Sequence, residues 1–118
     1  MKINSLFPSK YLRAGDLDGD LVVTMKSLMV EEINGEKKPV LHFIEEAKGL
    51  VLNKTNCKMI GSLHGSETDD WPGKKIALFP TEVDFRGEIV DAIRVRRQIP
   101  DDGEAEVSNQ EKQTSLSL

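Results

Sequence analysis

The fold that this sequence predicts depends on residues 21–30, LVVTMKSLMV. Apolar residues occupy alternate positions from Leu21 to Met25 and so share one face of a strand. The apolar phase then shifts by one residue, to Leu28 and Val30. One extra residue near Lys26-Ser27 accounts for this shift. The segment therefore predicts a long first strand that bends at a β-bulge.

Four further segments with period-2 alternation follow, and turn signals separate them. A turn that begins at Asn34-Gly35 ends at Pro39, which suits the first position of a strand because proline has no amide donor. Residues 46–49 and Arg86-Gly87 supply two more turns. Pro80 indicates that the outer half of its strand lies at a sheet edge or a bulge. The predicted later strands are residues 40–45, 50–53, 74–84 and 88–97.

One helical passage lies between the third and fourth predicted strands. Asn53 or Thr55 can cap its free amides, and Gly65 can end it in a left-handed conformation. The apolar residues that recur on one helix face are Cys57, Ile60 and Leu63. The passage therefore predicts one short amphipathic helix.

The predicted order of three strands, one helix and two strands describes an all-β domain with one short helix. A five-stranded Greek-key barrel of the oligonucleotide/oligosaccharide-binding (OB) type has its helix between strands three and four, and its long first strand must bend to join both sheets. The predicted bulge lies where that bend is needed. A β-grasp or SH3-like barrel also has five strands but does not account for a helix in this position. We therefore expect an OB-like barrel.

Length and charge predict one domain and a tail. A chain of 118 residues is long enough for a single core. Residues 1–97 contain 15 Lys or Arg and 15 Asp or Glu, so the surplus of negative charge lies after them. Residues 98–118 contain too few large apolar side chains to offset the entropy of ordering. We predict an OB-like domain over residues 1–97 and an acidic, disordered tail over residues 98–118.

Apolar runs and cysteine content indicate the compartment. The longest apolar runs, such as residues 21–23 and 50–52, are far too short to cross a bilayer. The first eight residues contain one lysine and no sustained apolar stretch, unlike a secretory signal. Cys57 is the single cysteine, so no internal disulfide can form. We expect a cytoplasmic protein with no membrane partner.

Three short motifs stand out in the chain: KTN (54–56), DDW (69–71) and PTEVDF (80–85). They are the most specific part of a resemblance to a family of small proteins found in phages and in bacteria that carry prophages, which covers roughly residues 9–97. The longer similar segments are KPVLHF (38–43), KGLVLNKTN (48–56), ETDDWPGKKIALFPTEVDFRG (67–87) and IRVR (93–96). The resemblance implies an accessory protein of phage type that acts in DNA metabolism, and it implies no established catalytic residues.

The titratable residues form no recognisable catalytic or metal-binding pattern. Cys57 and His64 would share one side of the helix, but a zinc site needs three or four ligands. Asp16, Asp18 and Asp20 resemble a calcium loop in composition only, because the glycine among them is misplaced and no glutamate follows at the twelfth position. We expect no catalytic residues, no metal and no cofactor.

A single-stranded nucleic-acid site needs cations along the backbone and flat side chains on which bases stack. In an OB fold, the loops after the first and fourth strands hold the ligand. The candidate binding residues are Lys37 and Lys38 in the first of these loops, Phe85 and Arg86 in the second, His42 on the second strand, and Arg94 and Arg96 on one face of the fifth strand.

Two observations limit this hypothesis. We expect Phe85 alone to be free for stacking, because three other aromatic residues belong to the predicted core: Phe43, Trp71 and Phe79. Arg94 and Arg96 could instead pair with Glu82 or Glu88 across the last hairpin. The balanced charge of residues 1–97 also predicts modest binding that depends strongly on salt.

The sequence therefore favours a non-enzymatic protein that binds single-stranded nucleic acid, above all single-stranded DNA. The alternative is a protein-interaction or assembly module, which would form a homo-oligomer or bind a host or phage protein without nucleic acid. The neutral body favours this alternative.

Overall fold

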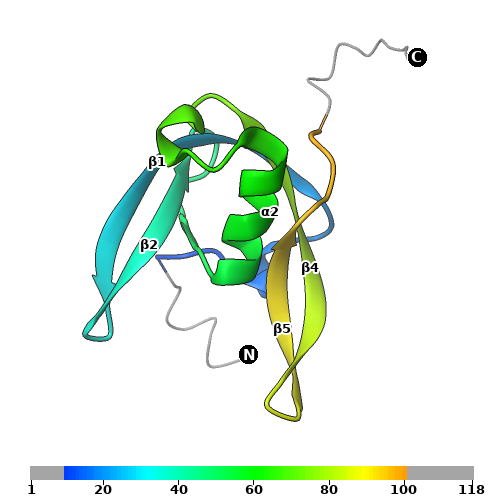
Figure 1. The fold of residues 1–118 in the computed structure, drawn as a ribbon. Coiled ribbons are helices and arrows are strands. Elements are labelled where there is room, and N and C mark those ends of the chain that lie inside the picture. Colours follow the sequence, from blue (N-terminus) through cyan, green and yellow to red (C-terminus); the bar gives the residue numbers. More distant parts are fainter. Residues whose placement is uncertain (1–9, 101–118) are drawn as a thin grey trace.

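The computed structural model describes residues 10–100 and shows five antiparallel strands in one open sheet with one α-helix (Figure 1). The strand order across the sheet is β3-β2-β1-β4-β5, which leaves β3 and β5 at the two edges. The prediction of a mostly β domain whose helix lies between the third and fourth strands is confirmed. The elements are η1 (Ala14–Asp16), β1 (Leu21–Ile33), β2 (Glu36–Phe43), β3 (Leu50–Val51), α2 (Lys54–His64), η2 (Thr68–Asp70), β4 (Lys75–Phe85) and β5 (Glu88–Val95).

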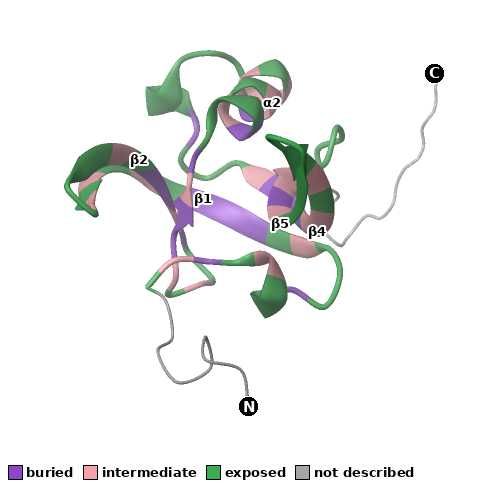
Figure 2. Ribbon diagram, turned by 90° about the horizontal axis from the view of Figure 1, so that it is seen from below, coloured by how far each residue is buried: buried purple, intermediate pink, exposed green. Residues whose placement is uncertain are grey.

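The long first strand bends where the apolar phase shifts. Its first part, Leu21 to Thr24, pairs with β4, and from Met25 onward it pairs with β2. The β1–β2 register breaks between Met25 and Ser27, so Lys26 is the extra residue of the predicted bulge. Figure 2 shows the buried inner half of β1 crossing the middle of the molecule. One strand can therefore join both halves of the sheet.

A tight turn joins the two strands of each long hairpin, β1–β2 and β4–β5. Asn34 and Gly35 have φ angles of 51° and 82°, and Arg86 and Gly87 have φ angles of 55° and 85°. Positive φ at both central positions is the geometry of a two-residue turn whose twist matches that of paired strands. Gly87 also donates its N–H to Asp84 Oδ1 at 3.0 Å. The turn between β4 and β5 therefore forms where it is predicted.

The start of β2 differs from the prediction. The turn of Asn34 and Gly35 is only two residues long, so β2 begins at Glu36 instead of residue 40. Lys37 and Lys38 pair with Glu32 and Glu31 of β1 and therefore lie in a strand, not in a loop. Pro39 is an interior residue of β2, and its carbonyl accepts from Leu52 N at 2.9 Å.

Pro80 lies where β4 leaves its partner β1. The β1–β4 ladder ends at Leu78, whereas the β4–β5 ladder continues to Phe85. Backbone groups along a strand point alternately to its two neighbours, and those of Pro80 point away from β5, to the side where β1 no longer pairs. Proline lacks an amide donor, and at this position no ladder hydrogen bond is lost. The prediction of an edge position is confirmed, and the outer part of the hairpin consists of β4 and β5 alone.

The helix packs across the opening between the two edge strands. Asn53 caps α2 by accepting from Asn56 N at 2.8 Å, which selects Asn53 over Thr55. Asn56 is 2% exposed and donates from Nδ2 to Ile93 O at 2.9 Å. This bond joins the first turn of α2 to the edge strand β5.

The core confirms most of the predicted apolar positions. Trp71 is buried, and its indole N–H donates to Gly65 O at 2.9 Å. Phe43 is buried as predicted, whereas Phe79 is only partly buried. The central core residues are Val23, Met25, Leu41, Phe43, Ile60, Trp71, Ile76 and Leu78.

The predicted domain boundary lies near the end of the described residues. Most of the predicted acidic tail, residues 101–118, lies outside them, so its disorder stays a prediction. Between residues 10 and 100, no helix has the length and apolarity needed to span a membrane. The cytoplasmic location stays a prediction.

Candidate nucleic-acid interface

The register of the β4–β5 hairpin places two kinds of side chain on opposite faces. Side chains directly opposite in an antiparallel pair lie on the same face, and neighbours along a strand lie on opposite faces. One face therefore carries the pairs Phe79 with Arg94, Thr81 with Ala92, Val83 with Val90, and Phe85 with Glu88. Arg86 and Arg96 stack on two phenylalanines of this face. We call Phe79, Val83, Phe85, Val90, Arg94, Arg86 and Arg96 the arginine–phenylalanine face.

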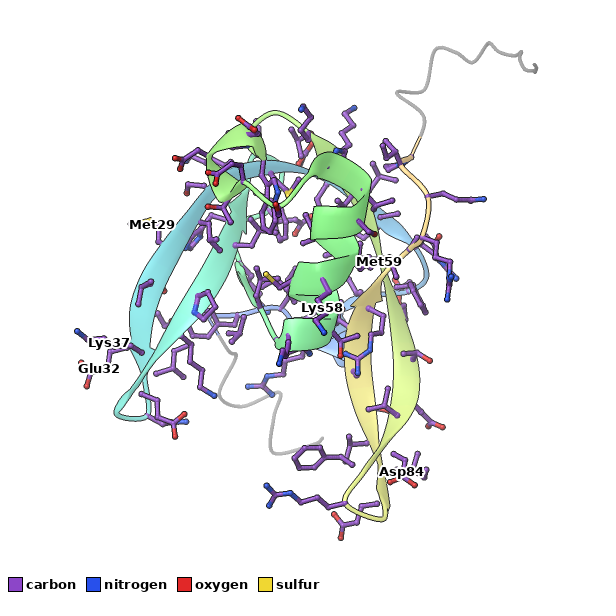
Figure 3. All side chains as sticks on the ribbon, viewed as in Figure 1. Met29, Glu32, Lys37, Lys58, Met59 and Asp84 are labelled. Carbon is purple, nitrogen blue, oxygen red and sulfur yellow. The ribbon has the colours of Figure 1, made fainter. Side chains whose placement is uncertain are left out.

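The opposite face carries most of the acids of the hairpin. The inner part of this face consists of core residues. Toward the tip of the hairpin, the register places Glu82 opposite Asp91 and Asp84 opposite Ile89 on the same face. Asp84 points away from the β1–β2 hairpin in Figure 3. Its neighbour Phe85 lies on the other face by strand alternation. Charge is thus separated across a single two-stranded ribbon.

The tip of the arginine–phenylalanine face is open to solvent. Phe85 is 58% exposed, and the guanidinium carbon of Arg86 lies 5.1 Å from the centroid of its ring. A large exposed aromatic side chain beside a cation is suited to base stacking and phosphate contact. The prediction that Phe85 is free for stacking agrees with this exposure.

A second cation–ring pair lies at the other end of the face. The guanidinium carbon of Arg96 lies 3.7 Å from the centroid of Phe79. Arg96 also donates from NH2 to Asp20 Oδ1 at 2.8 Å and from Nε to Asp20 Oδ2 at 3.1 Å. These hydrogen bonds lower the pKa of the Asp20 carboxyl and raise the pKa of Arg96. Arg96 therefore forms its ion pair with Asp20, not with Glu82 or Glu88.

Arg94 lies at the Phe79 end of this face. It is partly buried opposite Phe79, and its NH1 donates to Ile93 O at 3.3 Å. The sequence predicts that Arg94 and Arg96 lie on the same face of β5. Arg94 is opposite Phe79 and Arg96 stacks on the ring of Phe79, so both side chains lie on the arginine–phenylalanine face.

The lysine pair lies on the other hairpin. The β1–β2 and β4–β5 hairpins extend from the same end of the molecule on separate arms (Figure 1). Lys37 points away from the β4–β5 hairpin in Figure 3. Lys38 lies on the opposite face of β2, and its ammonium is 3.5 Å from Glu36 Oε1. The structure therefore brings Arg86 to Phe85 but does not bring Lys37 to them.

His42 takes part in an internal hydrogen-bond network. His42 Nε2 lies 2.5 Å from Glu31 Oε2, and Tyr11 donates its hydroxyl proton to Glu31 Oε1 at 3.0 Å. The bond from His42 is the main cause that lowers the pKa of Glu31, and the bond to Glu31 raises the pKa of Tyr11. These contacts join residue 11 to the β1–β2 hairpin, and they give His42 a structural role.

Three residues of the arginine–phenylalanine face are absent from the sequence prediction of this interface, namely Phe79, Val83 and Val90, and so is Asp20, the partner of Arg96. Phe79 shares its strand parity with Phe85, and this spacing of six residues is a signal that could have placed it on the same face. Asp20 belongs to an aspartate-rich turn before β1, and nothing local connects that turn with Arg96. Among residues 10–100, no group of three or more His, Cys, Asp or Glu side chains could hold a metal ion.

Comparisons of the chain with protein-family models, with curated proteins and with solved structures find no match. The geometry of the residues is therefore the basis of the functional argument.

Proposed function

We propose that this chain is an OB-type domain that binds single-stranded nucleic acid without catalysing a reaction. Three features support the fold part of the proposal. The strand order is β3-β2-β1-β4-β5, the shared strand β1 bends at a bulge, and α2 follows β3 in the chain. An OB fold is a partly open Greek-key barrel, and Asn56 of α2 bonds to the edge strand β5 where a closing strand would pair.

The arginine–phenylalanine face is the observation that carries the functional part. Sequence-independent binding of a single strand combines cations that follow the backbone with rings on which successive bases stack. Arg86 and Arg94 supply cations, and Phe85 supplies an exposed ring. Glu88 is the one carboxylate that the β4–β5 ladder places on this face, because Glu82, Asp84 and Asp91 lie on the other. A polyanion can therefore approach one side of the hairpin.

The proposal changes the position of the site that the sequence predicts. The ligand follows the β4–β5 hairpin instead of a cleft between the lysine pair and Phe85. His42 and Lys37 fall outside it, because His42 bonds to Glu31 and Lys37 points away. Single-stranded DNA is our preferred ligand, in keeping with the resemblance to phage-type proteins.

Fluorescence anisotropy with a labelled oligothymidylate tests the proposal. We expect Phe85→Ala to weaken binding by about five-fold or more, since stacking contributes about 1–3 kcal/mol per base. Arg94→Ala should weaken binding and flatten the slope of log K against log salt by about one unit. Lys37→Ala is the matched control, because Lys37 is an exposed cation on the other hairpin. Its removal should change neither the affinity nor the salt slope.

Absence of binding by the wild-type chain at micromolar concentration and low salt would contradict the proposal. Equal losses in Lys37→Ala and Arg94→Ala would move the site away from the arginine–phenylalanine face. Far-ultraviolet circular dichroism of each variant shows whether a loss of affinity reflects a loss of fold.

Exposed apolar side chains on the β1–β2 side favour a second candidate, a protein-interaction or assembly module. Met29 and Ile44 are 53% and 65% exposed and line the same pocket. Apolar side chains that gather on a surface mark interaction sites when they form a contiguous patch. Light scattering after nuclease treatment tests this candidate, which requires either a defined oligomer or a stoichiometric protein partner.

A further inference from the structure

Arg96 differs from the other cations of the arginine–phenylalanine face because its guanidinium is held on two sides. One side of the plane lies against Phe79, at 3.7 Å from the ring centroid. The edge formed by Nε and NH2 bonds to both carboxylate oxygens of Asp20, at 2.8 to 3.3 Å. A planar group fixed by a ring and a bidentate partner has a defined orientation.

About half of the Arg96 side chain stays exposed to solvent. The Arg96 side chain is 47% exposed, although it contacts both Phe79 and Asp20. Since one side of the plane covers the ring, the exposed area of this side chain is shared among the other side of the plane, the NH1 edge and the methylene stem. Arginine planes of this kind are surfaces on which unstacked bases lie.

The charge of Arg96 is already compensated. Asp20 is its ion-pair partner at 2.8 Å, and the Nε and NH2 donors point at that carboxylate instead of at a phosphate. A cation that is neutralised within the protein releases few counterions when nucleic acid binds. Its contribution to binding should therefore be stacking, with little dependence on salt.

We propose that Arg96, held flat on Phe79 by Asp20, is a stacking platform for one base, while Phe85 at the hairpin tip receives another. This inference rests on the proposed binding of single-stranded nucleic acid. Phe79 and Phe85 are six residues apart on one strand face, which separates the two platforms by about 20 Å. Arg94 lies opposite Phe79, beside the first platform, and contacts the backbone of the bound strand.

The test measures affinity as a function of salt for the full chain and its variants, with a labelled oligothymidylate of about ten nucleotides, a length within the range of single-strand sites. Arg96→Ala should lower the affinity about five-fold or more and leave the salt slope unchanged. Arg94→Ala should flatten that slope by about one unit. The two variants remove the same formal charge, so they form a matched pair.

Two further measurements separate stacking from charge. Arg96→Lys keeps the charge and loses the plane, so we expect it to bind as weakly as Arg96→Ala. An abasic oligomer of equal length keeps the phosphates and lacks the bases, so Arg96→Ala should bind it as well as the wild-type chain does, whereas Arg94→Ala should bind it less well.

Asp20→Asn tests Asp20 as a positioning residue. This substitution removes the compensating charge and half of the bidentate contact. Arg96 should then act as an ordinary phosphate contact, and the salt slope should steepen by about one unit. Loss of affinity with no change of slope in this variant would argue against compensation by Asp20.

The inference is overturned if Arg96→Ala flattens the salt slope as Arg94→Ala does, if Arg96→Lys restores wild-type affinity, or if Arg96→Ala binds the oligothymidylate like the wild-type chain. In each of these outcomes the wild-type chain still binds nucleic acid, so the proposed function stands. Failure of the wild-type chain to bind either oligomer would instead contradict the proposed function itself.

Discussion

Gly49 is a residue whose lack of a side chain shapes the edge of the sheet. A Cβ atom at this position would lie 2.8 Å from Val40 Cγ1 and 3.1 Å from Leu41 O. Leu12 N donates to Gly49 O at 2.8 Å, so the chain before η1 also depends on this position. Close contact on two sides leaves the backbone little room to adjust.

We predict that Gly49→Ala lowers the free energy of unfolding by about 1–3 kcal/mol, the usual cost of overpacking. Urea denaturation followed by the fluorescence of Trp71, which is the one tryptophan and is buried, measures the change. Gly15→Ala is the matched control, since no atom outside its own local backbone and chain neighbours lies within 4 Å of its Cβ position. Equal stability of the two variants would show that β2 can shift to make room for the added methyl group at Gly49.

Glu45 gives the stability of the chain a defined dependence on pH. Its carboxylate accepts from Thr24 Oγ1 at 2.6 Å and from Thr24 N at 2.7 Å. These two hydrogen bonds, the one from the hydroxyl first, lower the pKa of Glu45 below its ordinary value of 4.5. A lowered folded-state pKa means that the stabilisation is complete above the unfolded-state pKa and is lost as pH falls through the folded-state pKa.

We therefore predict that the free energy of unfolding decreases below about pH 4.5 and that Glu45→Gln shows a smaller decrease over the same interval. Thermal unfolding between neutral pH and about pH 3 measures both, because the unfolded carboxyl titrates within that interval. Glu32→Gln, at an exposed position of β1, serves as the control and should follow the wild-type chain. Identical pH profiles for Glu45→Gln and the wild-type chain would exclude this contribution.

At the scale of elements, the bulge in β1 lets one strand serve two partners. Lys26 is the extra residue, and it separates the part of β1 that pairs with β4 from the part that pairs with β2. A bulge bends its strand and increases the local twist. Without it, β1 would continue straight along β2 and leave β4 without its neighbour.

We predict that deletion of Lys26 abolishes cooperative unfolding or lowers the unfolding midpoint sharply, whereas Lys26→Ala, which keeps the residue count, leaves it near the wild-type value. Near-ultraviolet circular dichroism and the emission maximum of Trp71 report the loss of packing. A deletion variant with wild-type stability would show that the bend does not depend on the extra residue.

The two hairpins show how far local sequence predicts an element. Asn34-Gly35 and Arg86-Gly87 indicate turns, and both form. The length of the first turn was predicted wrongly because Pro39 suggested a strand start, whereas the two-residue turn allows pairing from Glu36 onward. Turn geometry is a local property, but the extent of pairing depends on the partner strand.

At the scale of the whole molecule, charge is distributed unevenly along the chain. Residues 1–97 are balanced, and five acids against one lysine lie in residues 98–118. Long-range repulsion between these acids and a polyanion acts over about 10 Å at 0.1 M salt and weakens as salt rises. The net charge of −4 therefore opposes binding at low salt.

We predict that a chain ending at Pro100 binds the labelled oligothymidylate several-fold more tightly than the full chain at low salt and equally well at high salt. Anisotropy titrations at both salt concentrations measure the difference. A chain of the same length whose five acids are replaced by Asn and Gln controls for the loss of residues and should match the truncated chain. A difference that persists at high salt would point to a contact other than long-range charge.

The sequence by itself determined the local features: alternation in the strands, the bulge, the turn of Arg86-Gly87, and a short helix between the third and fourth strands. These depend on neighbouring residues, whose spacing and conformational preferences can be read along the chain. Only the tertiary structure decided that Asp20 meets Arg96, 76 positions away, that Glu31 holds His42, and that the lysine pair lies on a separate arm from Phe85. Such contacts depend on strand order, register and twist together, because a shift of one residue moves a side chain to the other face of its strand.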